Sequence, residues 1–461
     1  MRMLRGLTLF FVFFGVLVSL GVVVVFALDY SYSTQHFTIW YDISGEDAVD
    51  PTDSDGDGTP DYIEKTGEYL EYAFDVYKNQ FGYPLNDYDE INVDVKDTKE
   101  INGKGKPLGY TAGCMKIVLD NDMDAKPFES ELLLIPDKLR FTTAHELFHI
   151  VQAKYTGDPY TPILCMFSRF SLIPDWIIEG TAKWDEDSVW DNINDYTKFA
   201  NSTLKTPYLS LTARDYSAVL YWKFFEKYSL LSDSNPTDSI SPVGTDLIFN
   251  LFGTLNFYNN FKNIAKPMDA VLKNHNTNWI ESFKDWLVTN YVFKLSNYHD
   301  WKYEEGNLYE PVGISDKKTL SIETSYRWLT SLPPWSGDYY EITLDPSVNK
   351  IKIEFSGSST SDKYAFIVLF IKNAGIELKV EPIQGWANNA ILKQTNNDYD
   401  KVVIIIAKIN DGEGTYEMGV SGFSGCDLTS ASITPLCTGD CDVGGKIKID
   451  ASYSGSCPTP A

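Results

Sequence analysis

Two histidines with a glutamate between them are the residues best suited to chemistry in this chain. His145 and His149 lie four residues apart in the run Thr-Ala-His-Glu-Leu-Phe-His-Ile-Val-Gln. On a helix, residues four apart share a face, so both imidazoles can bind one metal ion, and Glu146 can reach a water bound to that ion. Zinc lowers the pKa of such a water, and Glu146 would accept its proton. The spacing therefore predicts a hydrolytic zinc site.

Two structural interpretations compete with the metal site. Thr143 to Glu146 also fits a capping box, in which Glu146 only satisfies the start of a helix. Asp137, directly after Pro136, is the better helix start, and it places both histidines in mid-helix beside an apolar stripe. The other alternative is a pair of histidines satisfied within the core. The metal site is favoured because a third ligand follows in the sequence.

That third ligand is Glu179, thirty residues after His149. A catalytic zinc site with two histidines needs one more protein ligand and an open position for water. Glu179 stands among tryptophan and isoleucine residues, where a lone carboxylate would be costly, and zinc would neutralise it. Gly180 and Ala182 are small enough to let this predicted helix approach the first one closely. A solvated helix face suits the neighbouring acids better than it suits Glu179; these acids are Asp185, Glu186 and Asp187.

The sequence His-Glu-Leu-Phe-His, followed by Trp-Ile-Ile-Glu-Gly-Thr-Ala at residues 176–182, resembles the gluzincin metallopeptidases. It is most similar to secreted prokaryotic metalloproteases with an acidic calcium-type loop, and the resemblance covers residues 53–291. It implies a zincin-like fold, a peptide or protein substrate, zinc ligands His145, His149 and Glu179, and Glu146 as general base and acid. Thermolysin-like members place an aspartate four residues after the ligand glutamate to orient a histidine. This chain has Lys183 there, and Asp185 is the nearest alternative.

The same resemblance implies a donor for the oxyanion of the tetrahedral intermediate. Related gluzincins use a tyrosine or histidine beyond the ligand glutamate. Tyr216 and Tyr221 are the candidates in this chain, and we expect Tyr216 to be the catalytic one.

A second metal-binding pattern occupies residues 53–64. Carboxylates stand at its positions one, three, five, nine and twelve, and a glycine stands at position six. This is the pattern of an EF-hand calcium loop, in which position seven contributes a backbone carbonyl. The predicted Ca²⁺ ligands are Asp53, Asp55, Asp57, Thr59, Asp61 and Glu64. No helix is expected before the loop, because Pro51 interrupts one, so the ion would have a structural role.

The pattern of apolar residues divides the chain into a region of mixed helices and strands and a region of strands alone. Helical spacing predicts helices over residues 62–80, 137–155, 174–186, 216–228 and 279–291, and alternation predicts strands at 91–95 and 115–119. We therefore expect an α+β domain over residues 28–307. Beyond residue 316, alternating and continuous apolar runs at 350–355, 365–371 and 402–407 predict an all-β sandwich, jelly-roll-like, over 316–424.

Both ends of the chain carry features of an exported protein. Residues 1–27 combine Arg2 and Arg5 with a long apolar run, which predicts a signal peptide; an uncleaved N-terminal membrane anchor is the alternative. Four of the six cysteines lie in residues 425–461, which we interpret as a disulfide-bonded tail or a partial module. The expected location is secreted or extracellular, with anchoring through the N-terminus as the variant.

The composition limits the classes of partner. The chain has 461 residues, of which 43% are hydrophobic, and a net charge of −25, with 39 basic against 64 acidic residues. Such a chain should fold into two or three domains and should repel the phosphates of nucleic acids. The sequence thus predicts a zinc-dependent peptidase. The alternative is a non-catalytic, calcium-stabilised adhesion or scaffold protein at the cell surface.

Overall fold

The protein is described by a computed structural model, and its described residues are 28–83, 85, 90–99, 106–112, 116–124, 134–155, 173–226, 250–254, 265–273, 276–295, 302–322, 324–357, 359, 362–371, 379–384, 389–395, 399–423, 431–434 and 448–451. The predicted signal segment and all six cysteines lie outside these residues, and so do the predicted disulfides. Within the described part, no helix is both long and apolar enough to cross a bilayer.

The N-terminal half contains a mixed sheet whose strands follow the order β1-β2-β3-β5-β4. β2, β3 and β5 run parallel, whereas β1 and β4 pair antiparallel at the two edges. The strands are β1 (Tyr30–Ser33), β2 (Phe37–Tyr41), β3 (Ile91–Lys96), β4 (Gly109–Ala112) and β5 (Lys116–Asp120). In β3, buried Ile91, Val93 and Val95 alternate with more exposed residues, so one face of the sheet is apolar, as the alternation predicted.

Two long helices pack on each other and on this sheet: α2 (Asp61–Asp75), continued by a π-helical turn over Val76–Gln80, and α3 (Ile135–Tyr155). The sequence predicted both. α3 begins at Ile135, however, so Pro136 and Asp137 lie in its first turn and Asp137 is not the cap, because proline fits the first helical turn without losing a hydrogen bond. Residues 141–153 of α3 are all buried, which is the burial of a helix packed on every side.

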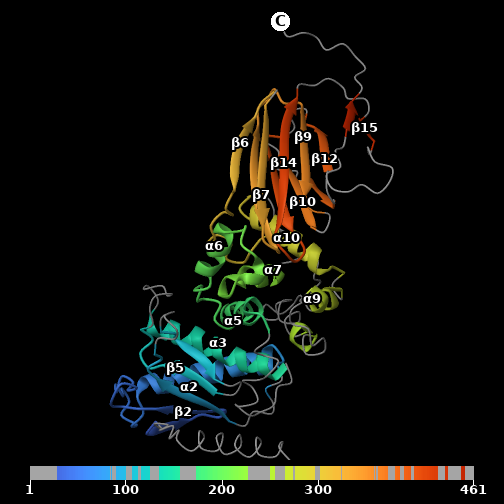
Figure 1. Ribbon diagram of the computed structural model, residues 1–461. Coiled ribbons are helices and arrows are strands. Elements are labelled where there is room, and N and C mark those ends of the chain that lie inside the picture. Colours follow the sequence, from blue (N-terminus) through green and yellow to red (C-terminus); the bar gives the residue numbers. More distant parts are fainter. Residues whose placement is uncertain are drawn as a thin grey trace, which may run out of the picture.

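Shorter helices lie between this layer and the β-rich half (Figure 1). They are α5 (Asp175–Val189), α6 (Thr197–Lys205), 3₁₀ turns at Leu211–Ala213 and Tyr216–Ala218, α7 (Val219–Glu226), α9 (Ala265–Leu272) and α10 (Trp279–Val292). The Asn278 side chain caps α10 by accepting from the backbone N–H of Glu281 at 3.0 Å. α6 and α9 had not been predicted, because their apolar spacing extends over only two turns.

The β-rich half consists of two sheets in the orders β11-β10-β13-β8-β6 and β12-β9-β14-β7. They enclose a common core to which both contribute, for example Ile342 and Phe366 from one sheet and Ile353 and Met418 from the other. The strands are β6 (Asp316–Leu320), β7 (Ser325–Leu332), β8 (Ser336–Leu344), β9 (Lys350–Gly357), β10 (Tyr364–Ile371), β11 (Lys379–Gln384), β12 (Asn389–Gln394), β13 (Lys401–Lys408) and β14 (Gly414–Phe423); β15 (Ala431–Thr434) and β16 (Lys448–Ala451) pair separately.

The outer face of the first of these sheets is covered by α10. Tyr339 of β8 donates its hydroxyl to the Leu287 carbonyl at 2.7 Å, and the Trp335 ring lies 4.8 Å from the Trp279 ring. Alternate residues of β10 and β13, such as Ile367 and Ile405, belong to the same apolar core as the helices. These two strands are therefore buried on both faces, which explains why their sequences are continuously apolar and do not alternate.

Candidate metal centre

Three ligand atoms from α3 and α5 converge in the interior of the N-terminal half. The Nε2 atoms of His145 and His149 are 3.1 Å apart, and Glu179 Oε2 lies 3.2 Å from the first and 3.6 Å from the second. Bonds of zinc to nitrogen and oxygen near 2.05 Å, arranged as a tetrahedron, would separate the ligand atoms by roughly 3.3 Å. The three residues that the sequence predicted as ligands thus form one triangle with the dimensions of a zinc site.

The His145 ring is oriented from behind by Glu186. Its Nδ1 lies 2.7 Å from Glu186 Oε1, which leaves Nε2 directed at the triangle. Lys183 in turn holds Glu186 through a 2.8 Å ion pair and binds Asp195 at 3.0 Å. The orienting carboxylate therefore stands seven residues after Glu179, at a position for which the sequence suggested only a solvated helix face. Lys183, where thermolysin-like proteins have an aspartate, binds this carboxylate as a cationic partner.

The Asp185 side chain does not take the orienting role that we had considered for it. Its carboxylate accepts a hydrogen bond from the Tyr77 hydroxyl, whereas Glu186 is the carboxylate bonded to the His145 ring. Asp185, Glu186 and Asp187 are all buried, so the prediction of a solvated face for them is wrong. Lys183 pairs with Glu186, and Lys223 pairs with Asp187 at 2.6 Å, so two of these acids have buried cationic partners.

His149 is oriented through Gln152, one turn further along α3. Its Nδ1 lies 2.8 Å from Gln152 Oε1, and the Gln152 amide nitrogen donates to the Ile178 carbonyl and to Thr181 Oγ1, both at 2.9 Å. An amide oxygen only accepts, so Nδ1 carries the proton and Nε2 keeps its lone pair. Gln152 therefore fixes the ring of one ligand and ties α3 to α5 beside the other.

Glu146 points to β4, the edge strand of the N-terminal sheet. Thr111 Oγ1 lies 2.9 Å from Glu146 Oε2 and 2.8 Å from the Glu146 carbonyl. Burial is the main reason that the pKa of Glu146 is raised, and the nearby histidines oppose the shift. α3 runs through Thr143, whose hydroxyl donates to the Arg140 carbonyl, so Glu146 is in mid-helix and the capping-box interpretation is wrong.

The charges around the triangle favour a cation. Burial would lower the pKa of His145, but Glu179 and Glu186 outweigh it and raise this pKa to about 10. Burial would conversely raise the pKa of Glu179, but the two histidines hold it well below its ordinary value. Glu179 is thus a carboxylate that is stabilised in its ionised form.

Of the two tyrosine candidates, only Tyr216 borders the triangle. Its ring lies 5.7 Å from the His145 ring, and 36% of the residue is exposed. Burial of the hydroxyl, followed by the charge of Glu179, raises the pKa of Tyr216 well above its ordinary value, so this hydroxyl stays a donor. Tyr221 is completely buried among aromatic rings, and its hydroxyl pairs with Ser282 at 3.0 Å.

Gly180 makes a close helix approach, but to a different partner from the one expected. A Cβ at this position would lie 2.7 Å from Trp222 Nε1 of α7 and 3.0 Å from the Ala218 Cβ. Trp222 Nε1 donates to the Trp176 carbonyl of α5 at 3.0 Å. Gly180 therefore admits α7, and Gln152 is one of several side chains that join α5 to α3.

The acidic loop before α2 brings together part of the predicted calcium ligand set. Asp53, Asp55 and Asp57 each place a carboxylate oxygen within 4.8 Å of the others, and Gly58 adopts the left-handed φ of 98° that the sharp turn requires. The carboxylate of Asp61 instead accepts from the Ser54 backbone and hydroxyl, at 2.9 and 2.6 Å. Thr59 donates its backbone N–H to Asp57. Glu64 lies in the first turn of α2, and burial together with the charges of the loop raises its pKa.

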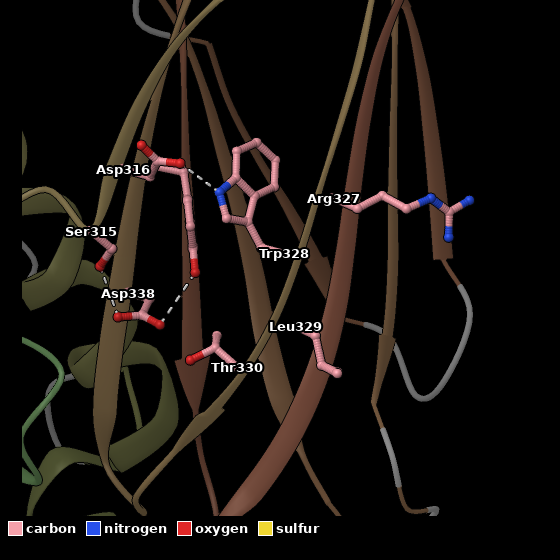
Figure 2. A pocket seen from close by; sticks show the side chains of 8 residues that line it. Ser315, Asp316, Arg327, Trp328, Leu329, Thr330 and Asp338 are labelled. Atoms are coloured by element: carbon pink, nitrogen blue, oxygen red, sulfur yellow. Dashed lines mark hydrogen bonds between the residues drawn. The ribbon is translucent and has the colours of Figure 1, made fainter.

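A cavity of about 470 Å³ lies elsewhere, in the β-rich half between β6, β7 and β8. Figure 2 shows Asp316 bonded to the Trp328 indole, at 2.8 Å, and Asp338 bonded to Ser315, at 2.9 Å. Lys318 also pairs with Asp316, at 3.1 Å. Donors of the chain itself thus satisfy these carboxylates, and the cavity is separate from the candidate metal centre.

Comparison with known proteins assigns no family. No family profile and no curated protein sequence matches the chain. Solved structures that align with parts of the chain include the pre-peptidase C-terminal domain of a Bacillus anthracis collagenase (16% identity, 23% of this chain and 94% of that one, TM-score 0.17). Others are an Aeromonas hydrophila periplasmic inhibitor of g-type lysozyme (16%, 23% and 99%, 0.16) and a family GH115 4-O-methyl-α-glucuronidase (10%, 61% and 39%, 0.16). TM-scores this low establish no common fold.

Proposed function

We propose that this protein is a zinc-dependent peptidase of the gluzincin type, with His145, His149 and Glu179 as zinc ligands. The observation that carries the proposal is the triangle of their three ligand atoms, with sides of 3.1, 3.2 and 3.6 Å. Glu186 binds the Nδ1 atom of His145, and Gln152 binds the Nδ1 atom of His149. Zinc-binding imidazoles commonly have such a partner at the nitrogen that does not bind the metal. A zincin-like N-terminal domain, a jelly-roll-like C-terminal domain and a structural Ca²⁺ in the acidic loop belong to the same proposal.

Residues of this chain would carry the proton transfers of peptide hydrolysis. When bound, zinc polarises the scissile carbonyl and acidifies a water molecule. Glu146 takes a proton from the attacking water and delivers it to the leaving amine, while Thr111 holds the carboxylate in place. The Tyr216 hydroxyl donates to the oxyanion that develops on the scissile carbonyl.

The edge position of β4 supports an extended peptide as the substrate. β4 ends the order of the N-terminal sheet and pairs only with β5 among the described strands, so its other edge has backbone groups that can pair. Thr111 of this strand contacts Glu146. An extended chain added to that edge would therefore run past the general base.

We expect the enzyme to be secreted, or anchored at the cell surface, because residues 1–27 have the sequence pattern of a signal peptide or membrane anchor.

Zinc removal and restoration test the proposal against the scaffold alternative. Zinc content would be measured on the purified full chain, and hydrolysis would be followed on a fluorescent casein. We expect about one zinc per chain, loss of hydrolysis with a zinc-selective chelator in excess Ca²⁺, and recovery when zinc is added. Bound zinc without hydrolysis would favour the non-catalytic scaffold, and a chain that binds no zinc would refute both the site and the enzyme.

Glu186→Gln should weaken zinc binding without abolishing it. The amide keeps the size of the side chain but removes the charge behind His145 and leaves Lys183 without its 2.8 Å partner. Removing such a supporting group typically lowers metal affinity about 10- to 100-fold. Competition with a zinc-binding dye would measure the change. Glu68→Gln, on the exposed face of α2, is the matched control, and an unchanged affinity in the Glu186 variant would contradict the orienting role.

A further inference from the structure

A second acidic segment, at the end of β5, has the same carboxylate spacing as the predicted calcium loop. Asp120, Asp122 and Asp124 stand at every second position, as Asp53, Asp55 and Asp57 do. The backbone also matches at the fourth position, where Gly56 has a φ of 78° and Met123 a φ of 53°. In both segments the fifth residue donates its N–H to the carboxylate of the third, at 3.2 Å in the loop and 3.0 Å at Asp124.

The three carboxylates of this second segment surround the ammonium group of Lys106. Asp120, Asp122 and Asp124 place ligand oxygens within 4.8 Å of one another. The Lys106 ammonium lies 3.0, 3.3 and 2.9 Å from their respective Oδ1 atoms, and Asp97 adds a fourth carboxylate at 2.9 Å. We call these four carboxylates the Asp97 cage. One ammonium group against four carboxylates leaves an excess of three negative charges.

One oxygen of the cage is buried and unsatisfied. The Asp120 side chain is completely inaccessible; its Oδ1 accepts from Thr98 and pairs with Lys106, but its Oδ2 has no hydrogen-bond donor among the described residues. An ionised carboxylate oxygen without a partner is costly in the interior. The lysine therefore does not satisfy the cage.

We propose that the Asp97 cage binds a divalent cation of the calcium type in exchange for the Lys106 ammonium. The donors are oxygens only, which suits a hard cation, and Ca²⁺ accepts an irregular set of carboxylates more readily than Mg²⁺, which requires a nearly ideal octahedron. Ca²⁺ binds oxygen at about 2.3–2.6 Å, so the cage would contract by roughly 0.5 Å around it. Lys106 is 21% exposed in its side chain and can swing into solvent when the ion enters.

The ion would fix two segments: the one before β4, which carries Thr111, and the one before α3, which carries the two histidines. The Asp120 backbone N–H donates to the Leu108 carbonyl, directly before β4 and its Thr111. Lys138, in the first turns of α3, donates to the Met123 carbonyl at 3.0 Å, and the Tyr62 hydroxyl of α2 donates to the Asp120 carbonyl at 2.6 Å. The cage thus joins β4, α3 and the helix that follows the acidic loop. Occupancy of the cage requires neither zinc nor catalysis.

Counting bound Ca²⁺ ions tests the proposal on the full chain. Zinc would be supplied at a stoichiometric amount, and Ca²⁺ would be measured by equilibrium dialysis and by titration calorimetry. The natural chain should bind one more Ca²⁺ than Asp122→Asn/Asp124→Asn, whose side chains are more than half exposed and whose loss the fold should tolerate. The doubly substituted Glu68→Gln/Asp75→Asn, which removes the same charge from an exposed face of α2, should keep the full count.

Lys106→Gln gives the second arm of the test. Removing the competing ammonium should tighten Ca²⁺ binding at the cage about tenfold or more, while Asp55→Asn/Asp57→Asn should leave the cage occupied. Equal Ca²⁺ counts in the natural chain and in Asp122→Asn/Asp124→Asn would overturn the proposal. So would an additional ion that appears only in Lys106→Gln, because the lysine would then exclude Ca²⁺ from the natural protein. Neither count depends on peptide hydrolysis, so failure here is separate from failure of the proposed enzyme.

Discussion

Glu146→Gln is expected to abolish peptide hydrolysis while zinc remains bound. The amide has the size of the carboxylate and can keep its contact with Thr111, but it cannot accept a proton from water. General-base catalysis contributes about 10²–10⁴-fold, so we expect kcat/KM to fall by roughly three orders of magnitude. The assay is the hydrolysis of a fluorescent casein, with zinc content determined on the same samples.

Thr111→Val is the matched control for this substitution. It removes the hydrogen bond that positions Glu146 but leaves the base itself in place, so its loss of kcat should be clearly smaller than that of Glu146→Gln. Both variants should retain about one zinc per chain. Hydrolysis by Glu146→Gln at the natural rate would contradict the proposed mechanism. Loss of zinc from that variant would show that Glu146 contributes to metal binding.

Lys183→Met is expected to lower the free energy of unfolding by about 3–5 kcal/mol, because it leaves two buried carboxylates without their common cation. Lys183 is 5% exposed and pairs with Glu186 and Asp195 at 2.8 and 3.0 Å. Burial raises the pKa of Asp195, but the charge of Lys183 and then that of Lys198 outweigh it and hold this pKa below its ordinary value. Methionine replaces the aliphatic part of the lysine side chain. The decrease in the free energy of unfolding therefore measures the effect of removing the charge. Urea unfolding followed by tryptophan fluorescence would measure it.

Lys65→Met is the control that separates the effect of burial, because it removes a lysine from an exposed ion pair. Lys65 pairs with Glu68 at 2.5 Å on the exposed face of α2, with both side chains more than half exposed. Such pairs contribute about 0–1 kcal/mol. Equal effects of the two substitutions would mean that the Lys183 pair is no more important than a surface pair. The substitution of Lys183 should also weaken zinc binding, because Glu186 then loses the partner that holds it behind His145.

The parts of the site that a short stretch of sequence signals could be predicted. The four-residue spacing of His145 and His149 places both rings on one face of any helix, and the apolar neighbours of Glu179 signalled a carboxylate in need of a cation. The structure brings these three side chains together. Asp53, Asp55 and Asp57 also converge, because their spacing follows from one turn of the chain.

Other contacts that depend on packing between elements could not be predicted. Thr111 reaches Glu146 only because β4 lies at the sheet edge beside α3, and a four-residue strand gives no pattern in the sequence. Glu186 was assigned to a solvated face because acidic residues usually are exposed, and nothing in the sequence announces that Lys183 and His145 surround it. Gly180 was matched to the wrong helix for the same reason, since its small size does not say which neighbour approaches.

The boundary near residue 307 marks a change in sequence texture, but the apolar core crosses it. α10 precedes that boundary, yet it packs on β8, β10 and β13 and shares their core. A gene that ended after α10 would lose the sheet on which this helix rests. A gene for the β-rich half alone would present Tyr339, Ile367 and Ile405 to water. The halves are therefore not interchangeable modules, and an engineer who wants to move the candidate metal centre into another protein has to move the C-terminal sheets with it.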